Sequence, residues 1–331
     1  MANTLAIGVD FGGTKVLASV VDVRNGEILG SSKKRTNSKD STDQLVDRLI
    51  GTIDDAIADA DLSKKQRVGG IGIGIAGQVD SETGVLLGAP NLSQATVDLP
   101  LADLISDRYK VTTTLLNDVQ IAAIGESRFG AGNGVDLFLC VFVGTGVGGA
   151  VVQDGKVLRG ISGSAGEIGH LVIHANGRIC GCGGRGHLEA YASRTAITQA
   201  IVGELKRGQP SSLRESIPEL QSAAPGGTAI RSGVLARAID GGDDLCIDIV
   251  NDAAYYLGLG IASAINLINP ARVILGGGVI ESVPLLFDNA AKHARRESLP
   301  SPGKAVSIVR AALGDNAGVV GAAIVGIGGE E

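Results

Sequence analysis

Residues 4–23 read TLAIGVDFGGTKVLASVVDV, two apolar and β-branched runs joined by the glycine-rich segment DFGGTK at residues 10–15. Runs of this kind on either side of a turn predict a β-hairpin. Glycines in the turn let the main chain approach a ligand closely, Thr14 and Lys15 can donate to a phosphate, and Asp10 can hold a magnesium ion. The same residues would also suit a hairpin whose glycines serve only the turn.

Outward from this hairpin, strand and helix patterns follow one another in an order that occurs twice. The first series is expected to contain strands at 4–9, 16–23, 28–35, 68–75 and 112–116, with a hairpin turn at Asn25 and Gly26. It is also expected to contain helices that begin at Ser41, where Gln44 can complete a capping box, and at Asp118. The second, looser series is expected to contain strands at 137–143, 150–153, 156–159, 272–275 and 306–309 and a last helix at 317–327. Two similar halves predict a duplicated α/β architecture, with a ligand in a cleft between the halves.

The composition limits the classes of protein to consider. The chain has 331 residues, a formal net charge of −6, 50 glycines and 3% aromatic side chains. This acidic, aromatic-poor balance argues against a basic face for nucleic acid or anionic lipid, and against stacking platforms for bases. The apolar run 137–153 contains several glycines and is shorter than the roughly 20 residues of a spanning helix, so no membrane segment is predicted. Four cysteines are too few for a disulfide framework, which favours a cytoplasmic protein.

A second glycine-rich turn, FVGTGVGG at residues 142–149, matches the Gly-x-Gly-x-x-Gly pattern of dinucleotide sites. That pattern needs a helix directly after the glycines, but residues 150–157 predict two strands around a turn. A nicotinamide-dependent dehydrogenase is therefore disfavoured, and a second phosphate-binding hairpin fits better. The chain also lacks the Gly-x-x-x-x-Gly-Lys-[Ser/Thr] segment of a P-loop protein.

Asn117 and Asp118 lie where a predicted strand ends and a helix begins. A carboxylate at that position can project from the end of the sheet and accept a proton from a hydroxyl that attacks a phosphorus atom. The structural alternative is that the aspartate is an ordinary helix N-cap, a role in which Asp is common.

The segment 167–189 holds the densest group of reactive side chains. Cys180 and Cys182 are too close in sequence for an unstrained mutual disulfide. With His170 and His187 they could form a closed tetrahedral zinc site, which would order this glycine-rich segment and the glutamates that flank it, Glu167 and Glu189. The alternative is a pair of reduced surface thiols beside unrelated histidines.

In this order along the chain, the motifs resemble the ROK family (repressor, open reading frame, kinase) of bacterial sugar kinases, from residue 10 to about residue 323. The resemblance implies the α/β actin-like ATPase fold, which is ribonuclease H-like, with two similar α/β domains around a cleft. The expected N-terminal domain comprises residues 1–118 plus 311–331, and the expected C-terminal domain comprises residues 119–310.

The resemblance also implies a role for each matched residue, with Asp118 as the catalytic base. The expected sugar ligands are Asn91, Asn117, Glu167, His170 and Glu189. The expected nucleotide-binding residues are Asp10, Gly12, Gly13, Thr14, Lys15, Gly144, Thr145, Gly146, Gly277 and Gly278. The expected zinc ligands are His170, Cys180, Cys182 and His187, an atypical set because the family usually has a third cysteine where this chain has His187.

The activity implied by the resemblance is transfer of a phosphoryl group from ATP, with Mg²⁺, to the primary hydroxyl of a hexose, most simply glucose. Fructose, mannose or an N-acetylhexosamine are alternative acceptors, and a sugar sensor without catalysis is a further alternative. Repressors of the family carry a helix-turn-helix module ahead of the phosphate loop, for which the residues before Asp10 leave no room. A homo-oligomer, dimer or tetramer, is expected, with no nucleic-acid or membrane partner.

Overall fold

The computed structural model describes residues 4–13, 15–36, 40–63, 66–89, 92, 97–216 and 229–328. The chain forms two compact units. Unit 1 comprises Met1–Asp136, Val151–Ala165 and Ala312–Glu331, and unit 2 comprises Leu137–Ala150 and Gly166–Ala311.

The first sheet has five strands in the order β3-β2-β1-β4-β7. Their bounds are β1 Leu5–Phe11, β2 Lys15–Asp22, β3 Glu27–Arg35, β4 Val68–Ile75 and β7 Thr112–Asn117. The first three strands pair antiparallel, and β1, β4 and β7 pair parallel. The predicted strands are thus all present, and the carboxyl ends of the parallel strands lie at one edge.

One face of the first sheet packs against α1 (Thr42–Asp59) and α2 (Leu101–Tyr109). The predicted capping box of α1 is confirmed: Ser41 accepts from the Gln44 amide, and the Gln44 side chain accepts from the Ser41 amide. Apolar side chains at helical spacing, Leu45 and Leu49 among them, then join Ile71 in one buried hydrophobic core.

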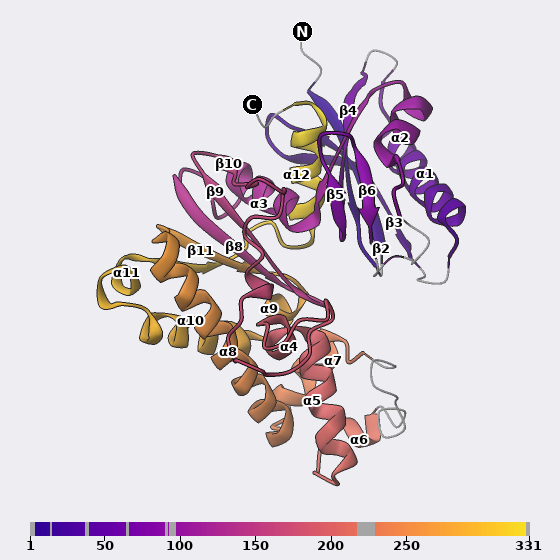
Figure 1. Ribbon diagram of the computed structural model, residues 1–331. Helices are drawn as coiled ribbons and strands as arrows, with labels where there is room; N and C mark the ends of the chain where they lie inside the picture. The colour runs from indigo at the N-terminus through magenta and orange to yellow at the C-terminus, as the bar shows by residue number, and fades with distance from the viewer. Residues whose placement is uncertain are drawn as a thin grey trace. The chain divides into compact units, whose positions relative to one another are not determined.

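The other face of the first sheet contacts α12 (Ala317–Gly326), beside α3 (Asp118–Phe129). Figure 1 shows α1 and α12 on opposite faces. The approach of α12 is close because the strands present glycine to it: a Cβ on Gly72 would lie 1.8 Å from the Ala322 carbonyl oxygen. Because α3 packs against α12, residues 119–136 belong to unit 1, and the chain leaves that unit after Asp136 rather than after residue 118.

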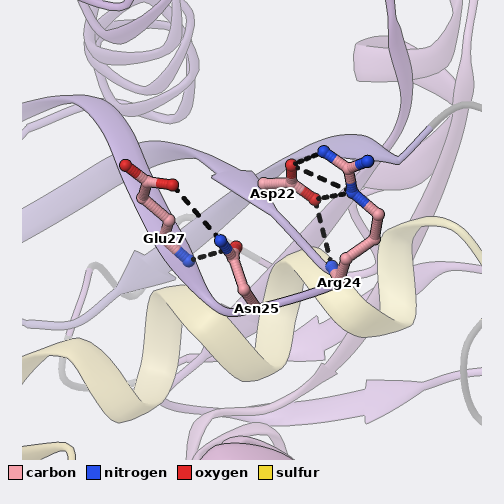
Figure 2. A network of polar contacts seen from close by, with 4 residues as sticks. All are labelled: Asp22, Arg24, Asn25 and Glu27. Carbon is pink, nitrogen blue, oxygen red and sulfur yellow. Dashed lines mark hydrogen bonds and ion pairs between the residues drawn. The ribbon is translucent and has the colours of Figure 1, made fainter.

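The turn between β2 and β3 forms at Asn25 and Gly26, where the sequence predicts a hairpin (Figure 2). Gly26 has φ +76°, a value that side chains other than glycine rarely adopt. Asn25 Oδ1 accepts from the Glu27 amide at 3.1 Å, and Asp22 Oδ1 accepts from the Arg24 amide at 3.1 Å. These local bonds hold the turn, and the Arg24 side chain lowers the pKa of Asp22 by hydrogen bonding.

A short hairpin of β5 (Gln78–Asp80) and β6 (Val85–Gly88) also belongs to unit 1 and was not expected from the sequence. Both strands are brief, and their residues show too little alternation to be distinguished from a loop.

The second sheet has the order β10-β9-β8-β11-β12. Its strands are β8 Leu137–Val143, β9 Val147–Gln153, β10 Lys156–Val157, β11 Arg272–Gly276 and β12 Ser307–Arg310. As in the first sheet, the last three strands pair parallel, here β8, β11 and β12. The chain passes from unit 2 to unit 1 within β9, which begins three residues before its predicted start at residue 150.

Helices supply most of the rest of unit 2. They are η1 Ile168–His170, α4 Glu189–Ala192, α5 Arg194–Lys206, α6 Leu213–Ser216, α7 Ser232–Asp240, α8 Asp244–Ile268, α9 Gly278–Ser282, α10 Pro284–Glu297 and α11 Pro300–Ala305. Figure 1 shows α8 and α10 side by side. The apolar run 137–153 forms strands β8 and β9, and among the described residues α8 is the helix that is long and apolar enough, at 25 residues, to cross a membrane. Half of its most apolar window is buried in the protein, as in a core helix.

Candidate active site and metal centre

The β1–β2 turn, residues 10–15, is closed by a hydrogen bond from the Gly12 amide to the Lys15 carbonyl oxygen at 2.9 Å. Lys15 Nζ lies 3.2 Å from Asp315 Oδ2, an ion pair to η3 (Gly314–Asn316) just before α12. Thr14, predicted to donate to a phosphate, lies outside the described residues. The turn therefore holds a lysine whose present partner is exposed and replaceable by an anionic ligand.

Asp10 is the half-buried residue before the end of β1, and it lies beside the first turn of α12. A Cβ on Gly318 would lie 3.2 Å from the Cβ and Cγ of Asp10, so a side chain at position 318 would crowd this carboxylate. Burial raises the pKa of Asp10, and the opposing charge of Lys15 offsets part of this shift. A bound cation would stabilise the ionised carboxylate further, and carboxylate oxygen is the ligand that Mg²⁺ prefers.

At the end of β7, Asn117 and Asp118 differ in what their side chains do. Asn117 is the N-cap of α3: its Oδ1 accepts from the amides of Val119 and Gln120 at 2.9 and 3.4 Å. Asp118 is the first residue of the helix, half-buried, and its Oδ1 also accepts from the Val119 amide at 3.0 Å. The capping alternative that the sequence left open therefore applies to Asn117, not to Asp118.

Asp10 and Asn117 lie at the same edge of the first sheet. Asp10 aligns with Gly74 in β4, and the next β4 residue, Ile75, aligns with Asn117 in β7. Parallel pairing thus brings together two of the predicted site positions that are distant in sequence. Asn91, the other predicted sugar ligand from this part of the chain, lies outside the described residues.

The four predicted zinc ligands converge in unit 2. Their ligand atoms all lie within 4.8 Å of one another. Nδ1 of His187 lies 3.3 Å from Nδ1 of His170 and 3.2 Å from Sγ of Cys182, and Sγ of Cys180 lies 3.9 Å from Nδ1 of His170. Tetrahedral zinc with ordinary bond lengths would separate its ligand atoms by roughly 3.3–3.8 Å. The donor set and its spacing therefore fit a zinc ion, with His187 in the place of the usual third cysteine.

Glu189 connects this cluster to the β8–β9 turn, residues 144–146. Its Oε1 accepts from the Cys180 thiol at 3.4 Å, and its Oε2 accepts from the Val147 amide at 3.0 Å. A Cβ on Gly146 would lie 2.3 Å from Oε2, so glycine is needed for this contact. Burial, with Glu189 nearby, raises the pKa of Cys180 to about 12. The predicted sugar ligand Glu189 is therefore also a structural link within unit 2.

Glu167 precedes η1 and is half-buried. Burial raises its pKa, the charge of His170 opposes the shift, and Glu189 adds to it. The structure therefore brings together Glu167, His170 and Glu189, which the resemblance assigned to one sugar site.

The glycines after β11 lie beside the end of β8. Gly276 aligns with Phe142, and Gly277 has φ +89° as the residue that precedes α9. A Cβ on Gly277 would lie 2.6 Å from the Val143 carbonyl oxygen. The predicted nucleoside contacts, Gly277 and Gly278, are therefore neighbours of the β8–β9 turn, although they are distant from it in sequence.

Sequence reasoning missed two charged residues at the turns, Asp315 and Arg194. Asp315 pairs with Lys15, and Arg194 Nη2 donates to Thr145 Oγ1 at 2.7 Å. Each partner lies far away in the chain, so no local spacing signalled either contact. The nearest signal in the sequence is the run of mostly small residues at 314–323, GDNAGVVGAA, which leads into the last helix and includes Asp315.

Comparisons with known proteins identify the family of the chain. The family model described as "ROK family" matches residues 6–327. A glucokinase of Halalkalibacterium halodurans is 33% identical over 97% of this chain and 94% of the relative. The crystal structure of a ROK family glucokinase from Streptomyces griseus, in complex with glucose and AMPPNP, superposes with a TM-score of 0.80 at 34% identity, covering 97% of this chain and 99% of that one.

A third relative shows that the family is not functionally uniform. The xylose repressor of Bacillus subtilis is 28% identical over 96% of this chain and 75% of the relative. Family and activity are therefore separate questions. On its sequence, and on the actin-like ATPase fold that it has in common with these structures, the chain belongs to the ROK family.

Proposed function

We propose that this protein transfers the γ-phosphoryl group of ATP to the primary hydroxyl of a hexose, most simply converting glucose to glucose 6-phosphate. The observation that carries this proposal is the division of roles at the end of β7, where Asn117 caps α3. Asp118 is therefore not required as the cap, and its carboxylate is suited to accept a proton. The glucokinases that are 33% and 34% identical over nearly the whole chain support glucose as the acceptor.

Asp118 acts as the general base in this proposal. The hydroxyl of a sugar becomes a better nucleophile when a carboxylate accepts its proton during attack on the phosphorus. Little other covalent chemistry is needed from the protein, because phosphoryl transfer depends mainly on positioning and on neutralising the phosphate charge.

The phosphates are bound by the two glycine-rich turns. Lys15 would exchange its exposed partner Asp315 for a phosphate oxygen, with Thr14, Gly12 and Gly13 presenting donors beside it. Gly144, Thr145 and Gly146 form the second phosphate contact, and Gly277 and Gly278 leave bare main chain for the nucleoside. Mg²⁺ bound with the nucleotide supplies charge neutralisation, and Asp10 is the carboxylate that would hold it or its water shell.

The hexose is bound by hydrogen-bonding side chains. Glu167, His170 and Glu189, which lie together in unit 2, are assigned to its hydroxyls, with Asn91 and Asn117 as further ligands. Zinc at His170, Cys180, Cys182 and His187 would order the segment that carries these side chains. The role of the ion is structural, because all four ligand positions come from the protein.

We further propose a cytoplasmic homo-oligomer, a dimer or tetramer. All four cysteines are free in the structure, as in proteins that remain in a reducing compartment. ATP as the phosphoryl donor also requires an intracellular location.

A coupled assay for ADP release tests the proposed activity on the purified chain with ATP and Mg²⁺. Glucose, fructose, mannose, N-acetylglucosamine and N-acetylmannosamine are the candidate acceptors. 6-Deoxyglucose and xylose serve as controls, because both lack the primary hydroxyl that receives the phosphoryl group. We expect ADP release with glucose and none with the two controls.

Two outcomes would overturn the proposal. Binding of glucose by calorimetry, with no ADP release from any hexose, would indicate a sugar sensor or repressor domain. ADP release with 6-deoxyglucose equal to that with glucose would indicate hydrolysis of ATP, not transfer to the sugar.

A further inference from the structure

The β8–β9 turn is held from one side by the beginning of α5. Arg194, the first residue of α5, donates its amide to the Gly144 carbonyl oxygen at 3.0 Å. The hydroxyl of Thr195 donates to the Thr145 carbonyl oxygen at 2.7 Å. Two successive carbonyl groups of the turn are thus bound by α5.

The Arg194 side chain adds a third bond to the same turn. Its Nη2 donates to Thr145 Oγ1 at 2.7 Å. Within the described part of the chain, Arg194 forms no ion pair with a carboxylate. Burial lowers the pKa of Arg194, which indicates that its charge is partly removed from water. A half-buried cation without an acidic partner is costly unless an anion joins it.

The hydrogen-bond chemistry of the pair determines where the Thr145 proton can go. A guanidinium has donors and no acceptor, so Thr145 Oγ1 is the acceptor in this bond. The hydroxyl proton is then available to another acceptor. An anionic oxygen beside the turn would accept the hydrogen bond from the Thr145 hydroxyl and would also balance the charge of the Arg194 guanidinium.

The two turns also differ in the source of positive charge. The β1–β2 turn contains Lys15 in its own sequence, whereas residues 143–149 of the β8–β9 turn read VGTGVGG and carry no charged side chain. A cation for the second turn has to come from elsewhere in the chain, and Arg194 is bonded to it.

We propose that Arg194 is a positioning residue for the nucleotide phosphates: it orients the Thr145 hydroxyl toward them and brings positive charge to the β8–β9 turn. This inference rests on the proposed kinase function. It adds Arg194, which lies outside the sequence motifs that resemble the family. Arg194 acts through Thr145, and the ligand that the Thr145 hydroxyl would bind is a phosphate group of the nucleotide.

Steady-state kinetics and equilibrium binding of AMPPNP to the full chain test this inference. Arg194→Met removes the donor and the charge, so we expect kcat/KM for ATP to fall by roughly 10- to 100-fold, the loss typical of a charge-assisted hydrogen bond. KM for glucose should stay near the wild-type value. Arg194→Lys should restore part of the loss, and the Kd for AMPPNP should rise in Arg194→Met while that for adenosine does not.

Thr145→Val and the double variant Arg194→Met/Thr145→Val test whether the two residues act as one unit. If they do, the double variant loses no more than the more damaging single variant. Arg207→Met is the matched control, since Arg207 lies at the other end of α5 and pairs with Glu204. It should leave ATP and glucose kinetics unchanged, and melting temperatures identify any variant that fails to fold.

The inference is overturned if Arg194→Met folds and keeps its AMPPNP affinity, if it weakens glucose and ATP equally, or if the double variant shows additive losses. A wild-type chain inert toward every hexose would overturn the proposed function instead. The AMPPNP and adenosine measurements would still decide the role of Arg194, because they need no sugar.

Discussion

The first and second sheets have the same plan but obtain their functional groups in different ways. Both have five strands, with an antiparallel hairpin at one side and three parallel strands at the other. In the first sheet, Asp10 lies in β1 next to its end, and Asp118 directly follows the end of β7. In unit 2, the reactive side chains come from the segment 166–194, which follows the hairpin of the second sheet.

This difference separates the features that both sheets have from the reactive side chains that occur in one unit only. Each glycine-rich turn occupies the same place, between the first parallel strand of its sheet and the next strand along the chain, β1–β2 and β8–β9. The carboxylate after β7 has no equivalent after β12, which ends in Arg310 and is followed by Ala311. The duplicated strand arrangement therefore provides one glycine-rich turn in each unit. The reactive side chains are not duplicated: Asp118 occurs only in unit 1, and the segment 166–194 occurs only in unit 2.

The largest effect should follow from removing the carboxylate that occurs in one half only. Asp118→Asn should lower kcat by about 10²–10⁴-fold, the range for loss of a general base, with a much smaller change in glucose affinity. Asp107→Asn, in an exposed part of α2, is the control and should leave kcat unchanged. Near-normal turnover of Asp118→Asn would remove Asp118 as the base and, with it, the functional asymmetry of the two sheets.

The second prediction concerns the metal cluster, which belongs to unit 2. Protein prepared without added metal should contain about one zinc per chain, and strong chelation should lower its melting temperature. The expected stabilisation is about 4 kcal/mol when free metal is near 1,000 times its Kd. His187→Ala should lose the metal, whereas His187→Cys should retain it, because imidazole and thiolate are both zinc ligands.

His174→Gln is the control for this prediction, since His174 lies in the same segment but outside the cluster. It should keep the full metal content. A chain whose stability and sugar binding are both unaffected by chelation would contradict a structural metal in this segment.

Much of this organisation could be predicted from local sequence. The Asn25-Gly26 turn, the capping box of α1 and the strands of the parallel halves all formed as expected, because each has a signal within a few residues. The start of β9 was predicted too late, since the two glycines that follow Val147 have weak strand propensity and this end of the strand is ordered by pairing with β8. The contacts of Asp315 and Arg194 join distant segments, so spacing along the chain does not reveal them.

The third prediction tests the close packing of α12 against β4 in the first sheet. Gly72→Ala would place a Cβ 1.8 Å from the Ala322 carbonyl oxygen, and neither main chain can yield without moving α12. We expect a loss of about 1–3 kcal/mol or more in the free energy of unfolding, measured by urea denaturation. Strand β11, the counterpart of β4, contains Val273, Ile274 and Leu275 and has no such glycine in its interior.

Gly88→Ala is the control for this variant, because a Cβ there meets nothing within 4 Å. It should leave the free energy of unfolding nearly unchanged. Equal stability of Gly72→Ala and Gly88→Ala would mean that α12 is not held by close main-chain contact, and the distinction between the two sheets in packing would be lost.

The smallest predicted effect concerns the N-terminal ends of α8 and α12. Asn316, which precedes α12, makes no capping side-chain bond, whereas Asp243 caps α8 by accepting from the Cys246 amide at 3.1 Å. Asp243 Oδ2 also accepts from the Ser211 hydroxyl and the Ser212 amide, each at 2.7 Å. Burial alone would raise the pKa of Asp243, but these hydrogen bonds outweigh it and lower the pKa below 3.8.

A folded-state pKa below the unfolded value means that the ionised cap stabilises the fold above the unfolded pKa. That contribution is lost as the pH falls through the folded-state pKa. Asp243→Asn keeps a capping side chain but removes the charge from the bonds to Ser211 and Ser212, so it should lower the free energy of unfolding by about 1 kcal/mol at pH 7. The difference from wild type should shrink as the pH falls below 3.8, the unperturbed value. Because other titrating groups are common to both proteins, they cancel in this difference, and a gap that stays constant with pH would show that the charge of Asp243 does not stabilise α8.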